Sequence, residues 1–492
     1  MRPYARPRSS PFAGSAGGTG GASGANFNDS DEADGMTTTR AMADERGHLR
    51  AEAGQRRLAT AWLVLGVTAL ALAGLFAILL VVARVPGTEA LFPTQDFFRV
   101  ALIVHVDQSV LIWFLAFSGV LWGLGKTVPA LSWTAFAVAT AGCLLVAASP
   151  FLGAGTPLLN NYVPVLDHDL FLAALALFAV GALLQVIAYL ARGWCDIRLE
   201  DPLAVGTATA AFAVLLAGFS LAWSWLGMNP AWEGKAYFEY VFWGPGHVLQ
   251  FAYTQIMLVA WIWLARSAER PLGLSDRWLS ALLVLGVLPL ALVPAIHGLH
   301  APDSAESRLA FTRLMQFGNA LAAVPIGLLL SVSLFRNRNR PVPLERLAAY
   351  RALIASLVLF AAGGALGASI AGANTVIPAH YHGSIVGVTL ALMGLTYHLL
   401  PELGFSSTTG RLARWQAVVY GSGQLVHIAG LAASGALGIQ RKTAGAAQQL
   451  DGVAKAFMGV MGLGGLLAVI GGIMFVLAVL LALTRRGASS RA

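Results

Sequence analysis

Residues 378–400 read PAHYHGSIVGVTLALMGLTYHLL, an apolar stretch long enough for a helix to cross a bilayer. Two histidines, His380 and His382, lie at its start. Histidines near the lipid interior are costly unless each has a partner, so the pair indicates a functional site. Because residues two apart on a helix point roughly 200° from each other, this stretch predicts one helix that offers an imidazole to each of two different sites.

The rest of the chain is equally apolar. Apolar residues make up 57% of the 492 residues and charged residues 11%, which is typical of a polytopic membrane protein. Runs of about 20 apolar residues predict about twelve transmembrane helices. They lie near residues 58–83, 97–124, 131–152, 168–191, 203–226, 239–264, 278–300, 311–335, 350–370, 376–400, 415–439 and 458–483. The alternating segments of a membrane β-barrel are not seen, so we predict an all-α polytopic membrane helix bundle.

Composition also divides the chain. Residues 1–57 are rich in Gly, Ser, Ala and charge and lack the apolar run of a signal peptide, which predicts a disordered cytoplasmic tail. Residues 58–485 form the predicted membrane domain, and residues 486–492 a short cytoplasmic tail. The two cysteines are too few for a disulfide framework or a thiolate metal centre. The net charge of +8 indicates no nucleic-acid partner, because the basic residues fall in loops.

Basic residues are concentrated in alternate loops, and this pattern predicts the orientation. By the positive-inside rule, both termini lie in the cytoplasm. Arg441 and Lys442 are exceptions, because they fall on an outer loop. This basic pair therefore needs a different explanation.

The span order brings six histidines to one depth. His105, His247, His297, His300, His380 and His382 come from four predicted helices and all fall in the outer third of the membrane. A single intramembrane histidine is often a hydrogen-bonded structural residue, but six at one depth favour a shared site. His168 is expected at the interface, and His398 and His427 do not match the layer and are interpreted as structural.

Imidazole is a ligand for haem iron and for copper, and a helix bundle can hold a porphyrin between facing histidines. His297 and His300 are three residues apart on one helical face, so both could reach one metal, with His247 as a third ligand. Such a metal would face a haem on His380. His105 and His382 could bind a second haem from both sides, and a six-coordinate haem is suited to electron transfer.

Three motifs carry a family resemblance. The strongest is Asn374-Thr375-Val376-Ile377-Pro378-Ala379-His380-Tyr381-His382, followed by Met393-Gly394. The others are Arg308-Leu309-Ala310-Phe311-Thr312 leading to Ala323-Val324-Pro325-Ile326-Gly327, and Gln424 leading to Gly438-Ile439-Gln440-Arg441-Lys442. With these motifs the chain resembles the haem–copper oxidase superfamily, subunit I of cytochrome c oxidase and its nitric-oxide-reductase relatives, over roughly residues 58–485.

The resemblance implies two haems and one non-haem metal, either copper or iron. His105 and His382 would bind the low-spin haem and His380 the high-spin haem. His247, His297 and His300 would bind the non-haem metal, and Arg441 and Lys442 would contact haem propionates. The family normally has two adjacent histidines on helix 7, whereas here Ile296 precedes His297. Either the helix is irregular there, or only one of the pair binds metal.

A second departure concerns the reaction. Many oxygen reductases of the family carry a tyrosine one turn after the helix 6 histidine, and here that residue is Phe251. Other oxygen reductases carry it on helix 7, but residues 278–300 contain none. Nitric oxide reductases need no such tyrosine, so both O2 and NO remain candidate substrates.

The resemblance therefore predicts the catalytic subunit of a respiratory terminal reductase in a bacterial inner membrane, with its active site toward the periplasm. The sequence has no Cys-x-x-Cys-His motif, so we expect a separate electron-donor subunit of cupredoxin or cytochrome c type. One alternative is a nitric oxide reductase specifically, and another is a non-respiratory haem- or metal-binding membrane protein. A transporter would show internal repeats and broken helices, of which only Gly244-Pro245-Gly246 is a candidate.

Overall fold

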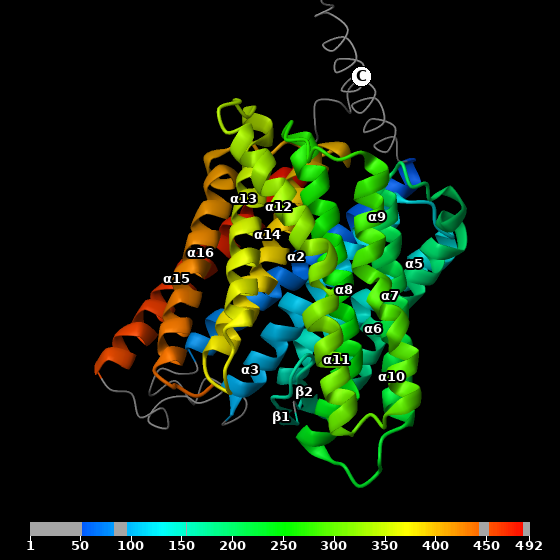
Figure 1. Ribbon diagram of the computed structural model, residues 1–492, viewed down its shortest axis with the longest axis vertical. Helices are drawn as coiled ribbons and strands as arrows, with labels where there is room; N and C mark the ends of the chain where they lie inside the picture. Colours follow the sequence, from blue (N-terminus) through cyan, green and yellow to red (C-terminus); the bar gives the residue numbers. More distant parts are fainter. Residues whose placement is uncertain (1–51, 83–95, 154, 442–451, 486–492) are drawn as a thin grey trace, which may run out of the picture. The chain divides into compact units, whose positions relative to one another are not determined.

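A computed structural model describes residues 52–82, 96–153, 155–441 and 452–485 (Figure 1). The α-helices are α2 (Ala53–Val82), α3 (Phe97–Val106), α4 (Trp113–Leu124), α5 (Pro129–Ala148), α6 (Asp169–Gly193), α7 (Pro202–Leu226), α8 (Gly234–Ser267), α9 (Asp276–Val287), α10 (Val293–Leu299), α11 (Ala305–Gly318), α12 (Ala320–Arg336), α13 (Leu344–Ala368), α14 (Val376–Glu402), α15 (Arg411–Ala436) and α16 (Gly452–Leu483). A π-helical segment, η2 (Asp107–Ile112), and three short 3-10 segments, η3 (Ser149–Phe151), η4 (Trp194–Asp196) and η5 (Leu288–Leu292), lie between them. The predicted all-α membrane helix bundle is confirmed.

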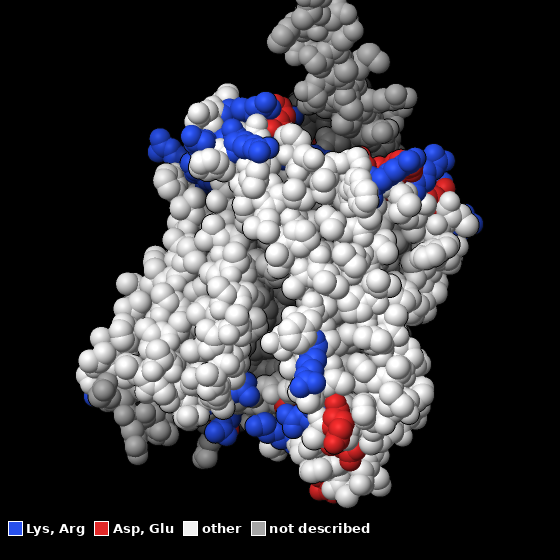
Figure 2. Space-filling model, viewed as in Figure 1, with Lys and Arg blue, Asp and Glu red and all other residues white. Residues whose placement is uncertain are grey.

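The described residues contain 11 helical segments long and apolar enough to cross a membrane. The predicted span 415–439 is not among these 11; it corresponds to α15, which has 26 residues but a more polar composition, including Gln416, Gln424 and His427. Charged side chains gather toward the two ends of the helices and leave an uncharged band between them (Figure 2). This distribution is the one expected of a protein whose middle lies in hydrocarbon.

Glycines bring α15 and α16 into backbone contact. A Cβ added at Gly464 would lie 2.3 Å from the backbone nitrogen of His427, and one added at Gly430 would lie 2.5 Å from that of Met461. Small residues at such positions let membrane helices approach closely, where packing and polar contacts hold them together. The polar helix α15 is therefore packed against its neighbours despite its composition.

Two spans have irregular backbones next to candidate site histidines. The π-helical segment Asp107–Ile112 interrupts the second span directly after His105. The 3-10 segment Leu288–Leu292 contains Pro289 and is followed by Pro294, so the seventh span is broken before His297. Proline removes a backbone donor and clashes with the preceding turn, which explains this second break. Of the two alternatives left open for this span, the structure shows the irregular helix, and it does not test which histidine binds metal.

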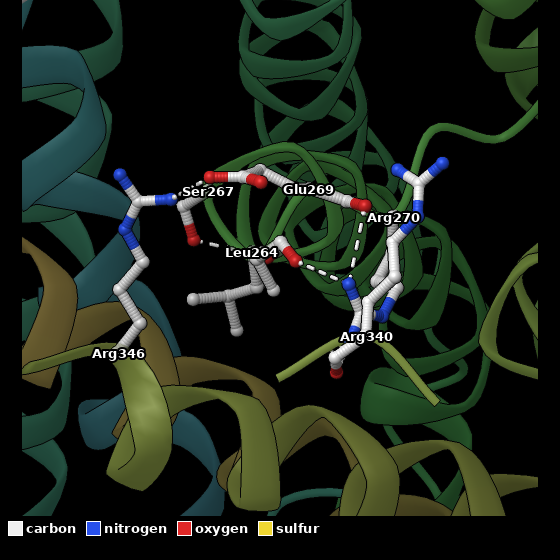
Figure 3. A network of polar contacts seen from close by, with 7 residues as sticks. Leu264, Ser267, Glu269, Arg270, Arg340 and Arg346 are labelled. Atoms are coloured by element: carbon white, nitrogen blue, oxygen red, sulfur yellow. Dashed lines mark hydrogen bonds and ion pairs between the residues drawn. The ribbon is translucent and has the colours of Figure 1, made fainter. Parts of the chain in front are cut away.

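A polar network fixes the end of α8 that is expected to face the cytoplasm (Figure 3). Arg270 is only 1% exposed, and its guanidinium donates to the carbonyl oxygens of Ala268 at 3.0 Å and Arg340 at 2.7 Å. Arg346 pairs with Glu269 at 3.1 Å. These contacts tie α8, the helix that carries His247, to the segment between α12 and α13.

A short hairpin lies at the other end of α8, which is expected to face outward. Strand β1 (Thr156–Leu158) pairs antiparallel with β2 (Val165–Asp167), with Pro157 opposite Leu166. The loop between the strands carries Asn161 and Tyr162. The backbone nitrogen of Asn161 donates a hydrogen bond to the Glu239 carboxylate of α8 at 2.8 Å. The hairpin thereby places its loop over the outer half of α8.

The predicted terminal tails lie mostly outside the described residues. Of the segment 1–57, residues 1–51 are not described, and α2 already begins at Ala53. The segment 486–492 is not described either.

Candidate functional site

His105 on α3 is held by the neighbouring helix. Its Nδ1 lies 2.8 Å from the carbonyl oxygen of Ala73 on α2. A carbonyl only accepts, so Nδ1 of the neutral ring carries the proton and Nε2 keeps its lone pair. The ring remains partly exposed, although Val104 and Asp107 beside it are buried.

His382 on α14 lies beside a second histidine. The rings of His382 and His427 have centroids 4.8 Å apart and meet edge to face. An electrostatic interaction also links His382 with His105. His427 is in turn held by α16, because its Nδ1 lies 2.9 Å from the carbonyl oxygen of Met461. Three histidines from α3, α14 and α15 therefore belong to one region.

His380 is two residues earlier on α14 and faces a different neighbour. Its Nδ1 lies 2.7 Å from the carbonyl oxygen of Gly363 on α13. A Cβ added at Gly367 would lie 2.7 Å from the same nitrogen, so this glycine gives the ring its place. His380 is thus directed at α13 and His382 at α15, as the spacing of the two residues on one helix requires.

His105, His380 and His382 have environments that fit haem ligation. His105 and His380 each have the proton on Nδ1 engaged by a backbone carbonyl, which leaves the Nε2 lone pair for a metal. All three rings are partly exposed within the bundle. On the face shown in Figure 2, the surface is hollowed between α13 and α14 on one side and α11 and α12 on the other.

His247 on α8 has a different environment. Its Nδ1 lies 2.6 Å from the carbonyl oxygen of Trp243, and its Nε2 lies 2.7 Å from the hydroxyl of Tyr162. The side chain is 1% exposed. Burial, followed by the charge of Glu239, raises the pKa of the Tyr162 phenol, so this hydroxyl keeps its proton and can donate it.

His297 on α10 is also buried, at 5% exposure. Its Nε2 lies 2.8 Å from the hydroxyl of Ser220 on α7. The ring of Phe311 packs against it with a centroid distance of 5.1 Å and lies 6.4 Å from the ring of His247. Phe311 is therefore a shared neighbour of the two histidines.

The predicted ligand set of His247, His297 and His300 does not assemble. Helix α10 ends at Leu299, and His300 has extended backbone angles, so it lines an open groove with Arg313 instead of sharing a face with His297. Among the residues that the structure describes, no three His, Cys, Asp or Glu side chains are grouped as a metal site would require. These residues do not fit the predicted non-haem metal.

Arg441 follows α15 and lies near the hairpin loop, and its contact with haem propionates stays a prediction. Its Nη1 donates to the side-chain oxygen of Asn161 at 3.4 Å, and it interacts electrostatically with Tyr381, between His380 and His382. Lys442 lies outside the described residues.

The sequence does not predict that Tyr162 and Ser220 contact site histidines, or that His427 lies beside His382. Tyr162 belongs to an irregular loop with no periodic signal, and its contact with His247 joins residues 85 positions apart. His427 is interpreted from the sequence as structural, because its predicted depth in the membrane differs from that of the six candidate histidines. The contact of His427 with His382 depends on the packing of α15 against α14.

Comparisons with known proteins agree with this arrangement. Residues 57–483 match the family model described as cytochrome c and quinol oxidase polypeptide I. An uncharacterised protein of Rickettsia prowazekii (strain Madrid E) is 31% identical over 487 residues, covering 85% of this chain and 94% of the relative. An uncharacterised protein of Aquifex aeolicus (strain VF5) is 28% identical over 355 residues, covering 72% and 87%.

The fold comparison points the same way. A solved heme-copper terminal oxidase dimer superposes with a TM-score of 0.65 at 16% identity, covering 87% of this chain and 84% of that one. The family-model match over most of the chain identifies the class of protein as a membrane-embedded oxidoreductase. The chain belongs to the haem–copper oxidase subunit I family.

Proposed function

We propose that the chain carries two haems and passes electrons from an outer donor, through a low-spin haem on His105 and His382, to a high-spin haem on His380 that binds O2 or NO. One observation supports this above all. His380 and His382 come from one helix, yet their rings contact different helices, at Gly363 of α13 and His427 of α15. Two ligands on one helix with different neighbours support the proposal that each binds its own haem.

The chain's own residues orient the ligands. A bound haem supplies iron that carries an electron and, where an axial position is open, holds a diatomic molecule. The carbonyl oxygens of Ala73 and Gly363 fix the rings of His105 and His380 and make their Nε2 atoms more basic. Arg441 is placed to neutralise a propionate near Tyr381.

The substrate is a small diatomic, O2 or NO. Phe251 cannot supply the electron and proton that a tyrosine gives when the O–O bond breaks, which favours NO. The contacts of His247 support a second candidate, a non-respiratory haem protein that binds or buffers NO, because they leave no evident place for a second metal. Steady consumption of O2 or NO with a reduced donor would separate a reductase from such a binder.

The donor is proposed to be a separate subunit on the outer side, of cupredoxin or cytochrome c type. Because the histidines and Arg441 lie near the outer ends of their helices, this side gives the shorter electron path. In a bacterial inner membrane the outer side is the periplasm.

The haem assignment is tested with His380→Ala and His382→Ala in the full chain. We expect the first to lose the high-spin haem spectrum, including the CO adduct of the reduced protein, and the second to lose the low-spin spectrum. His168→Ala is the matched control, because this histidine caps α6 through Leu170 and contacts none of the site residues. Haem spectra that stay unchanged in both variants would end the proposal.

A further inference from the structure

We infer that His247 and His297 hold no non-haem metal in this chain, and that the phenol of Tyr162 takes the place on His247 that such a metal would need. The inference refines the proposed function and rests on its haem pocket. It departs from what the family resemblance implies for these residues.

The first argument concerns the lone pair of His247. A neutral imidazole has one N–H donor and one lone pair. Nδ1 faces the carbonyl oxygen of Trp243 at 2.6 Å and must donate to it, which leaves the lone pair on Nε2. The hydroxyl of Tyr162 lies 2.7 Å from Nε2 and donates to that lone pair. Metals bind imidazole through its lone pair, so Tyr162 and a metal compete for the same atom.

The second argument is that the loop is built to hold Tyr162 there. Tyr162 has φ of +64°, a conformation rarely adopted by residues with a side chain, and the Val163 nitrogen donates across it to the Asn161 carbonyl at 2.9 Å. Glu239 anchors Asn161 through its backbone nitrogen and its side chain. Strained residues persist only where their surroundings enforce them, and they gather at functional sites.

Helix α8 is complementary to this tyrosine. A Cβ added at Gly246 would lie 2.3 Å from Cγ of Tyr162, so only glycine leaves room for the ring. The indole of Trp243 meets the phenol ring edge to face at 5.5 Å between centroids. The segment Gly244-Pro245-Gly246 thus receives Tyr162 beside His247.

The third argument concerns the other two expected ligands. His297 uses Nε2 toward Ser220, and only its buried Nδ1 has no hydrogen-bond partner among the described residues. His300 lines the groove between α10 and α11 instead. A protein site for copper, zinc or iron normally has about three or four ligands, and here one nitrogen remains.

The test is metal analysis of the purified full chain. Iron and copper are compared with haem content, before and after anaerobic incubation with Cu(I) or with Fe(II) and removal of the excess. A His247→Ala/His297→Ala double variant sets the adventitious background. We expect no metal beyond haem iron above that background. About one equivalent of copper or non-haem iron per chain, retained by the unmodified protein and lost in the double variant, would overturn the inference.

The Tyr162 contact has its own measurement. The infrared C–O stretch of Tyr162 is identified as the band lost in Tyr162→Phe, and it is then followed in His247→Phe. A shift of that band supports the pairing, and an unshifted band contradicts it. Tyr240→Phe in the His247→Phe background controls for other tyrosines, because Tyr240 contacts Trp232 instead. Haem spectra of His380→Ala and His382→Ala test the proposed function, whereas metal content and the Tyr162 band test this inference. A failure of one proposal can therefore be told from a failure of the other.

Discussion

At the scale of single residues, backbone carbonyls decide what each histidine can do. Ala73, Gly363 and Met461 supply the carbonyl oxygens that engage Nδ1 of His105, His380 and His427. At His247 the carbonyl belongs to its own helix, at Trp243, and the remaining nitrogen meets a phenol. Equivalent imidazoles thus differ in whether their lone pair is available, because their second neighbours differ.

Gly246→Ala tests the contact between α8 and Tyr162. The added methyl group would lie 2.3 Å from Cγ of Tyr162, near the backbone end of that side chain, so the loop itself must move. We expect the free energy of unfolding to fall by about 1–3 kcal/mol, as for other overpacked sites. Denaturation in detergent measures it.

Gly364→Ala is the matched control for this substitution. Gly364 lies inside α13 and has no atom within 4 Å of an added Cβ. Alanine is the better helix former, so the control should be neutral or stabilising by up to about 1 kcal/mol. Equal effects at the two positions would argue against the close fit of Tyr162 on Gly246.

At the scale of elements, local breaks and close contacts position the site. Helix α10 ends at Leu299, between His297 and His300, and the π-helical segment after His105 changes the phase of the second span. Helix α15 packs directly against α13 and α14, and glycines also bring it into backbone contact with α16. The geometry of the site therefore depends on irregularities that a uniform helix would not have.

Gly464→Val tests the contact of α15 with α16. The new side chain would meet the backbone of His427 at 2.3 Å, and backbone cannot move out of the way cheaply. We expect lower thermal stability and a changed low-spin haem spectrum, because His427 packs on His382. Gly472→Val, with open space around its Cβ, should change neither. An unchanged spectrum in Gly464→Val would contradict a role for His427 near that haem.

At the scale of the whole molecule, charge sets the orientation. The basic loops alternate along the chain, and the ion pair of Arg277 with Glu200 at 2.7 Å joins two loops expected on the cytoplasmic side. The 3-10 segment Trp194–Asp196 belongs to the same side by this rule. It contains Cys195, which is exposed, whereas Cys143 is buried.

Labelling with a membrane-impermeant maleimide tests this orientation. We expect Cys195 to react in inverted membrane vesicles and not in intact spheroplasts, because its loop is predicted to face the cytoplasm. Cys143 should react in neither. Glu306→Cys, exposed at the start of α11, should react from the opposite side. Reaction of Cys195 in spheroplasts would invert the topology.

The sequence was sufficient for the class of fold, whereas the haem ligands that it indicates stay predictions. Apolar runs of bilayer length predict the helices whatever their neighbours are, because hydrocarbon forces each segment to satisfy its backbone internally. The spacing of His380 and His382 likewise predicts opposite directions from helix geometry alone. The predicted span 415–439 is a helix, α15, but it is too polar to count among the 11 membrane-spanning segments of the described residues.

The contacts of the other histidines depend on the tertiary structure. Tyr162 reaches His247 from a hairpin 85 residues away, Ser220 reaches His297 from another helix, and His427 reaches His382 from α15, which packs on α14. A residue type shows that a side chain can bind metal. Whether its lone pair is free depends on hydrogen-bond partners that come together only when the helices pack.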